Sequence, residues 1–142
     1  MAGNIDARLA ELGIALPEAS TPQANYVPYT VSGNLVFVSG QIPKIGDDMI
    51  TGKLGADADL ETGQKAARYC ALNIIAQVKN ACGGDLDRIT RCLKLGGFVN
   101  GAPDVIVEIF GDAGRHARFA VAVACLTTAV ILWRLVRHGR PG

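Results

Sequence analysis

Apolar side chains near the start of the chain recur at helical spacing. Ile5, Leu9 and Leu12 are separated by four and three residues, which is the spacing of one face of an amphipathic helix. Asn4 is a candidate N-cap, because its side chain can accept a backbone N–H bond, and Gly13 is a candidate end. The pattern predicts a short helix, followed by the proline-containing connector "LPEASTPQ".

A longer apolar stripe in the middle of the chain predicts the main helix. Asp59 is a candidate cap, since a carboxylate there accepts backbone N–H bonds and suits the positive end of the helix. Gly83 and Gly84 predict the end of this helix. The stripe recurs every three or four residues, at Ala67, Ala71, Ile74, Val78 and Ala81.

Two segments after the connector predict a β-hairpin. "NYVPYTVSGN" contains a short strand and a turn at Ser32, Gly33 and Asn34. "LVFVSGQI" is apolar without clear alternation, which is typical of a strand buried on both faces. The polar, glycine-punctuated loop "KIGDDMITGKLG" comes next and includes a candidate short strand at Met49 and Ile50.

The second half of the chain contains further strand candidates. "RITRCLKLGGFVN" alternates and predicts a long strand that is weakened or bulged at Gly96 and Gly97. "APDVIVEIFGDAG" fits both a strand and a short helix. "HARFAVAVACL" and "TTAVILWRLVRH" are rich in β-branched residues and predict two strands. These two strands explain the uncharged run 119–133 better than a membrane span, which needs about 20 apolar residues.

The order of the predicted elements indicates an α+β fold. Helix, two strands, helix, strand, short helix and two strands suit a mixed β-sheet with helices packed on one face. The length of 142 residues fits one domain, residues 1–142, with no internal repeat.

Composition and charge narrow the function classes. Nearly half of the residues are hydrophobic and the net charge is +1, so no broad basic field indicates a nucleic-acid partner. The four cysteines form no CxxC pair and only two histidines are present, so we expect no zinc site and reduced thiols, mostly buried. The N-terminus lacks a basic start followed by an apolar run, so we expect no signal peptide and a cytoplasmic location.

Four successive segments carry a family resemblance. They begin with "ANYVPYTVSGNLVFVSGQIP" and "TGKLGADADLETGQKAARYCALNIIAQVK". They continue with "GGDLDRITRCLKLGGFVNGAPD" and "DVIVEIFGDAGRHARFAVAVACL". Together they resemble the RidA/YjgF family, also called the L-PSP or perchloric-acid-soluble family. The resemblance is closest to the branch of this family with an N-terminal extension, here residues 1–16.

The resemblance implies a chorismate-mutase-like fold assembled as a homotrimer, with small-carboxylate ligands bound in clefts between subunits. It also implies hydrolysis of reactive 2-imino acids, such as 2-iminobutanoate and 2-iminopropanoate, to 2-oxo acids and ammonia. No metal or organic cofactor and no membrane partner is expected. Other family members are described as endoribonucleases or translation inhibitors.

The resemblance assigns ligand-binding roles to Arg118 and to the Ser39–Gly40 pair at the end of a predicted strand. Arg118 matches the substrate arginine of the family, and a guanidinium can bond both oxygens of a carboxylate. Taken without the resemblance, it is a solvated arginine at a strand start. Ser39 and Gly40 match the Ser-Gly pair of the site, where the missing side chain of Gly40 lets a ligand approach the main chain. The alternative for this pair is an ordinary turn before Pro43.

Two further residues border the implied site, and one histidine matches none of its positions. Tyr26 matches an aromatic that closes the cleft from a neighbouring subunit, and core packing is its alternative role. Ala120 stands where many relatives have a cysteine, so it can supply only a backbone N–H. His116 matches no catalytic position, and we interpret it as a loop or surface residue.

Two departures from the family pattern bear on catalysis. Asp104 joins directly to "VIVEIFG", so a loop that carries a site asparagine in relatives is absent. Trp133 falls where relatives have the glutamate thought to activate water, and tryptophan cannot accept a proton from water. Residues 127–142 therefore form an atypical C-terminus, and we expect impaired catalysis or a different water-activating group.

Three functions stay open at this point: an imine deaminase, a non-catalytic homotrimeric binder of small 2-oxo or imino carboxylates, and an RNA-directed nuclease or translation inhibitor. The near-neutral charge disfavours the third. Its one supporting feature is a small basic tail made of Arg134, Arg137, His138 and Arg140.

Overall fold

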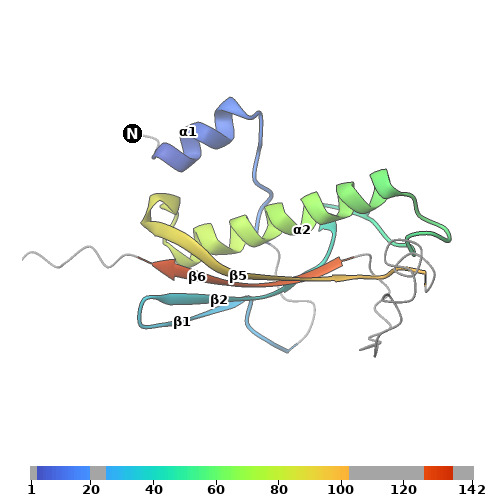
Figure 1. The fold of residues 1–142 in the computed structure, drawn as a ribbon. Helices are drawn as coiled ribbons and strands as arrows, with labels where there is room; N and C mark the ends of the chain where they lie inside the picture. Colours follow the sequence, from blue (N-terminus) through green and yellow to red (C-terminus); the bar gives the residue numbers. More distant parts are fainter. Residues whose placement is uncertain (1–2, 20–24, 103–126, 136–142) are drawn as a thin grey trace, which may run out of the picture.

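The computed structural model describes residues 3–19, 25–102 and, by their backbone, 127–135. Its element order matches the predicted order of helix, hairpin, helix and long strand (Figure 1). The elements are α1 (Asn4–Glu11), β1 (Tyr29–Ser32), β2 (Leu35–Gln41), β3 (Lys44–Ile45), β4 (Asp48–Met49), α2 (Leu60–Ala81), the 3₁₀ helix η1 (Leu86–Arg88), β5 (Ile89–Val99) and β6 (Thr127–Leu135).

Four of the strands form one sheet in the order β1-β2-β6-β5. All three ladders between these described strands are antiparallel, and a parallel pairing within the predicted mixed sheet stays a prediction. The predicted strand at "TTAVILWRLVRH" is confirmed as β6, which lies between β2 and β5. The predicted elements at "APDVIVEIFGDAG" and "HARFAVAVACL" lie outside the described residues.

The hairpin of β1 and β2 is confirmed, with Gly33 at a φ of +59° in its turn. The prediction that β2 is buried on both faces is wrong for the single chain. Val36 and Val38 are buried against α2, while Phe37 between them is 43% exposed. The continuous apolar run reflects an outer face of the sheet that nothing in the described chain covers. The short strand predicted at Met49 and Ile50 appears one residue earlier, as β4, and pairs with β3.

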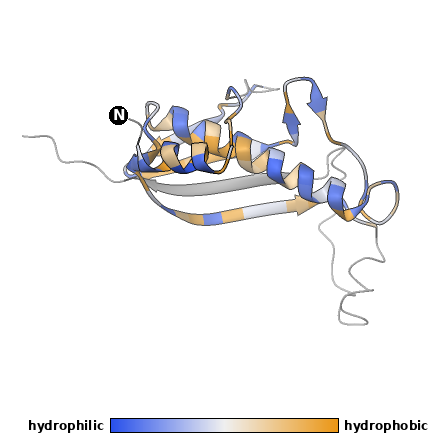
Figure 2. Cartoon of the chain, turned by 90° about the horizontal axis from the view of Figure 1, so that it is seen from above, coloured by the Kyte–Doolittle hydropathy of each residue, from blue (hydrophilic) through white to orange (hydrophobic). Residues whose placement is uncertain are grey.

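The main helix α2 lies along one face of the sheet (Figures 1 and 2). Asp59 caps it as predicted, since its Oδ1 accepts the backbone N–H of Thr62 at 2.8 Å. Gly83 and Gly84 follow its end with positive φ angles, also as predicted.

The predicted apolar stripe is wrong in the first half of α2. Ala67 and Ala71 are exposed, and Ala66 and Cys70 are buried instead. The preceding loop explains the shift, because its Ile50 packs against Ala66. The second half of the stripe is as predicted, with Ile74 and Val78 in the core.

The strand β5 is long, as predicted, but its irregularities lie elsewhere. The register shifts between Ile89 and Arg91 and between Cys92 and Lys94, whereas Gly96 and Gly97 pair regularly with β6. The predicted bulge at the two glycines is therefore wrong.

No disulfide joins the cysteines within the described residues. Cys70 and Cys82 are buried, as expected, and Cys92 is exposed. Burial raises the pKa of the Cys82 thiol, which keeps it protonated and unreactive. Cys125 lies outside the described residues.

Among the helices that the structure describes, none combines the length and the apolar character that a membrane span needs.

The helix α1 lies over the C-terminal half of α2, on the side away from the sheet (Figure 1). Its N-cap is Gly3, not Asn4 as predicted, and no side chain of α1 caps it. The carboxylate of Asp87, from η1, instead accepts the backbone N–H groups of Asn4 at 2.7 Å and Ile5 at 2.9 Å. A side chain 82 and 83 residues away in sequence thus replaces a local cap, which a local pattern cannot show. The predicted end at Gly13 is confirmed by its φ of +64°.

A second contact holds α1 in place. The Lys79 ammonium on α2 forms a salt bridge with Asp6 on α1, with 2.8 Å between Lys79 Nζ and Asp6 Oδ1, and both side chains are about two-thirds buried. Ile5 and Leu9 pack against the core cluster below them. The helix is therefore anchored by one apolar edge and two polar contacts.

We expect Asp87→Ala to loosen α1 without unfolding the domain. Two helix N–H groups lose their acceptor, and the loss of a cap costs about 1 kcal/mol. Hydrogen–deuterium exchange of the backbone amides of residues 4–12 should become faster, while exchange in α2 stays the same.

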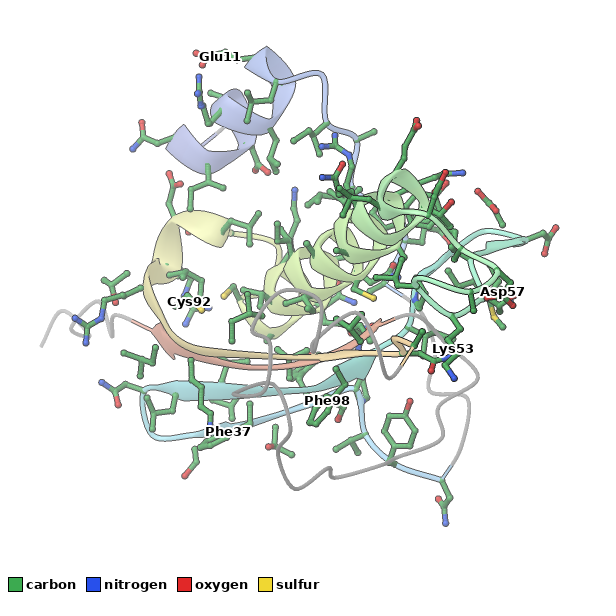
Figure 3. All side chains as sticks on the ribbon, turned by 45° about the vertical axis from the view of Figure 1, so that its right-hand side comes forward. Glu11, Phe37, Lys53, Asp57, Cys92 and Phe98 are labelled. Atoms are coloured by element: carbon green, nitrogen blue, oxygen red, sulfur yellow. The ribbon has the colours of Figure 1, made fainter. Side chains whose placement is uncertain are left out.

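Glu11→Ala is the matched control, because Glu11 forms only an exposed pair with Arg8 at the far end of the same helix (Figure 3). Exposed pairs of this kind contribute little. Equal exchange of α1 amides in the two variants would contradict the role assigned to Asp87.

Candidate functional site

A pocket of about 600 Å³ lies at the C-terminal end of β2. Its walls come from four parts of the chain: the connector after α1, the segment before β1, the end of β2 with the turn into β3, and one face of α2. The lining residues are Pro17, Glu18, Ala19, Tyr26, Pro28, Gly40, Gln41, Ile42, Lys44, Ile45, Gly46, Asn73 and Gln77.

Two of the predicted site residues line this pocket and a third supports it. Tyr26 and Gly40 are both in the wall of this pocket within one chain, whereas the resemblance implied that Tyr26 closes the cleft from a neighbouring subunit. Ser39 lies next to Gly40, but its hydroxyl donates to the carbonyl of Val27 at 2.6 Å, and its backbone N–H donates to the carbonyl of Pro28 at 3.0 Å. Ser39 therefore fixes the segment that carries Tyr26 against the end of β2. Arg118, Ala120 and His116 lie outside the described residues, so their predicted roles stay predictions.

The strand register locates Trp133 relative to the pocket. Trp133 pairs with Val36 on β2 and with Cys92 on β5, whereas the β6 residue opposite Gln41 is Ala129. Four residues of a strand span about 13 Å. The position that the resemblance matches to the family's glutamate thus lies near the N-terminal end of β2, away from the end of β2 that borders this pocket.

Three buried amide side chains form the floor of the pocket, and sequence reasoning missed them. Gln41, Asn73 and Gln77 are each at most 5% exposed. Asn73 and Gln77 are separated by four residues on α2 and lie beside Ile74 and Val78 of the apolar stripe. Polar residues in such a stripe indicate a buried polar group that needs partners, and this signal was available in the sequence.

The amide of Asn73 fixes the turn after β2. Its Nδ2 donates to the carbonyl of Ile42 at 3.1 Å and to the carbonyl of Lys44 at 2.7 Å. Gln41 makes a similar contact from the other side, because its Nε2 donates to the carbonyls of Ser39 at 3.1 Å and Gly40 at 3.3 Å. The main chain around Gly40 and Lys44 is therefore held rigid by buried side chains.

Two charged residues are among the lining residues, Lys44 and Glu18. Lys44 is half-buried and Glu18 is exposed. Within the described chain, no group of three His, Cys, Asp or Glu side chains is arranged to hold a metal ion. The polar groups available to bind a ligand in this pocket therefore include side-chain amides, one ammonium and one carboxylate.

The β3–β4 hairpin, which contributes Lys44 and Ile45 to the pocket, is fastened to α2. The Tyr69 hydroxyl donates to Asp48 Oδ2 at 2.7 Å, and the Lys65 ammonium donates to the same oxygen at 3.2 Å. The hydrogen bond from Tyr69, followed by the bond from Lys65, holds the pKa of Asp48 below its usual value. The carboxylate in turn raises the pKa of both Tyr69 and Lys65.

We expect Tyr69→Phe to raise the pKa of Asp48 toward the ordinary value of 3.8. A carboxyl with a lowered pKa stabilises the fold above its unfolded pKa, and this contribution is lost as the pH falls through the folded pKa. The contact between hairpin and helix should therefore weaken in acid, and should weaken at a higher pH in the variant.

An NMR titration of the Asp48 carboxyl carbon measures this pKa. Tyr26→Phe is the control, since Tyr26 has no hydrogen bond to Asp48 in the structure, and it should leave the titration unchanged. An Asp48 pKa that is the same in wild type and Tyr69→Phe would rule out the hydroxyl as the main cause of the shift.

Comparisons with known proteins agree with this architecture. The family described as "YjgF/chorismate_mutase-like, putative endoribonuclease" matches residues 6–135. The Trypanosoma cruzi protein TCP17 is 47% identical over 140 residues, covering 87% of this chain and 86% of TCP17.

Two solved structures are similar in both sequence and fold. The Agrobacterium tumefaciens protein Atu1372, of unknown function, is 40% identical, with a TM-score of 0.70 over 92% of this chain and 91% of that one. A Shewanella oneidensis MR-1 protein described as "a putative endoribonuclease" is 32% identical, with a TM-score of 0.75 over 94% of this chain and all of that one.

Proposed function

Because the chain belongs to the YjgF/chorismate-mutase-like family, we propose that it hydrolyses small 2-imino acids to 2-oxo acids and ammonia. The observation that carries this proposal is the pocket in which Tyr26 and Gly40 meet, with Ser39 holding the two segments together. These are the residues that the family resemblance assigns to the ligand. The pocket volume of about 600 Å³ easily accommodates a small acid.

The reaction needs few catalytic groups. Water adds to the C=N carbon, the C–N bond breaks, and the nitrogen leaves as ammonia while the C=O bond forms. The enzyme must hold the carboxylate, orient the C=N group and accept a proton from water. We assign the carboxylate to Arg118 by its match to the family, and the close main-chain approach to Gly40.

The group that accepts the proton differs from that of the family. Trp133 cannot accept it, and its register position is distant from the pocket. Glu18 has the one carboxylate among the described lining residues of the pocket. It is the candidate base in this proposal.

The endoribonuclease alternative is supported by the description of the family and of the Shewanella oneidensis relative. The net charge of +1 and a pocket with one lysine among its described residues weigh against it. A non-catalytic binder of the same small carboxylates is the remaining alternative, and the turnover experiment separates it from the enzyme.

We expect the purified protein to accelerate ammonia release from 2-iminobutanoate that a dehydratase generates in the assay. Arg118→Ala should lower this acceleration about a hundredfold, because one charge-assisted bidentate contact is lost. Arg134→Ala is the control, since it removes an arginine that has no assigned ligand.

No acceleration above buffer by the wild-type protein would refute the enzymatic proposal and favour the binder. Cleavage of RNA that weakens steeply as salt rises, without imine turnover, would favour the endoribonuclease.

The uncovered face of the sheet supports a homotrimer. Phe37 is 43% and Phe98 is 50% exposed, and both lie on the side of the sheet away from α2 (Figure 3). Exposed apolar side chains gathered on one face mark an association surface. We propose that three copies bury this face, as the family resemblance implies.

Light scattering should therefore give a mass three times that of the 14.9 kDa chain. Phe37→Asp should shift the mass toward the monomer, because a carboxylate is costly to bury in an apolar interface. Leu60→Asp is the control, since Leu60 is 72% exposed on α2. A monomeric wild-type protein would overturn the assembly.

A further inference from the structure

Asn73 presents a buried acceptor that no described residue uses. Its side chain is 3% exposed, and both of its side-chain hydrogen bonds within the described residues use the Nδ2 donors, which bind the carbonyls of Ile42 and Lys44. Within residues 3–19 and 25–102, no group donates to Asn73 Oδ1. Buried polar atoms are almost always hydrogen-bonded in native proteins, so an acceptor in a pocket wall that no described residue uses indicates a site for a ligand donor.

Lys44 adds an open charge beside this acceptor. It is half-buried, lines the same pocket, and forms no ion pair with any residue that the structure describes. Its backbone carbonyl is 2.7 Å from Asn73 Nδ2, so the two residues are direct neighbours. An ammonium on a flexible four-carbon stem can reach an anion anywhere near that point of the wall.

The two groups demand complementary features from one ligand. An ammonium donates and requires an anion, whereas the Asn73 oxygen requires an N–H or O–H donor. Glu18, the other charged lining residue, is exposed, so water screens it more than it screens the half-buried Lys44. The part of the pocket near the turn after β2 therefore favours a negative group.

We propose that Lys44 and Asn73 form a recognition subsite for a small carboxylate that bears an N–H or O–H group on the adjacent carbon. Lys44 binds the carboxylate, and Asn73 Oδ1 accepts the neighbouring donor. This inference rests on the proposed function for its ligand class, because a 2-imino acid has a carboxylate beside a C=N–H group. It adds a carboxylate contact independent of Arg118 and a hydrogen bond that distinguishes the imine from the 2-oxo product.

Three probes test the two contacts separately by calorimetry. 2-Hydroxybutanoate has both the carboxylate and the donor, 2-oxobutanoate has no donor, and 2-hydroxybutanamide has no charge. We expect 2-hydroxybutanoate to bind most tightly. Lys44→Met should weaken both carboxylates about tenfold to a hundredfold, as expected for loss of a charge-assisted bond, and should leave the amide unchanged.

Lys44→Arg should keep most of the affinity, because it keeps the charge. Lys94→Met is the control, since Lys94 is exposed on β5 and is not a lining residue. Unchanged thermal melting of Lys44→Met shows that its effect is on binding. If Lys44→Met fails to fold, Lys44→Gln, which also removes the charge, decides the question by the same loss of carboxylate affinity.

The outcomes separate this inference from the proposed function. Equal binding of the carboxylates by wild type and Lys44→Met overturns the subsite, even if imine turnover is found. Lys44-dependent binding without turnover supports the subsite and refutes the enzyme. If 2-hydroxybutanoate does not bind the wild-type protein, the subsite is overturned, whatever the ammonia assay gives. If 2-oxobutanoate binds more tightly than 2-hydroxybutanoate, the role of Asn73 is overturned.

Discussion

The packing of α2 on β2 is the interaction on which the rest of the structure depends. Ile74 and Val78 on the helix meet Val36 and Val38 on the strand, and all four are at most 2% exposed. Full burial of such a side chain contributes roughly 1.5–3 kcal/mol. Because Asn73 adjoins Ile74, the contact that forms the core also brings an amide to the turn after β2. Core and pocket therefore share one helix face, and neither can move without the other.

The pocket is rigid on one side and less constrained on the other. Buried amides fix the main chain from Ser39 to Lys44, and the Asp48–Tyr69 bond fastens the β3–β4 hairpin. The opposite wall is the connector after α1, which depends on how α1 is docked. Pre-organised walls lower the cost of binding, because less freedom is lost when the ligand arrives.

Much of the fold was predictable because it follows local rules. Asp59, Gly13 and Gly33 act through their own neighbours, and each was predicted correctly. The wrong predictions depend on residues that are distant in sequence or on other chains. Ile50 packs against Ala66, and Asp87 replaces a local cap. Phe37 stays exposed in the single chain. The site was predictable only as far as the motif reached, at Tyr26 and Gly40. Asn73 was missed because its role depends on a turn 30 residues away.

The docking of α1 has a thermodynamic consequence for any molecule that fills the pocket. Pro17 and Ala19 line the pocket and belong to the connector after α1, the helix whose N-terminus Asp87 binds. If a ligand binds more tightly when this wall is in place, the ligand must strengthen the docking of α1 by the same factor, since coupling between two equilibria is reciprocal. The docking of the N-terminal extension then depends on whether the pocket is occupied. A substitution at Asp87 would alter the affinity of the pocket for its ligand without contacting that ligand.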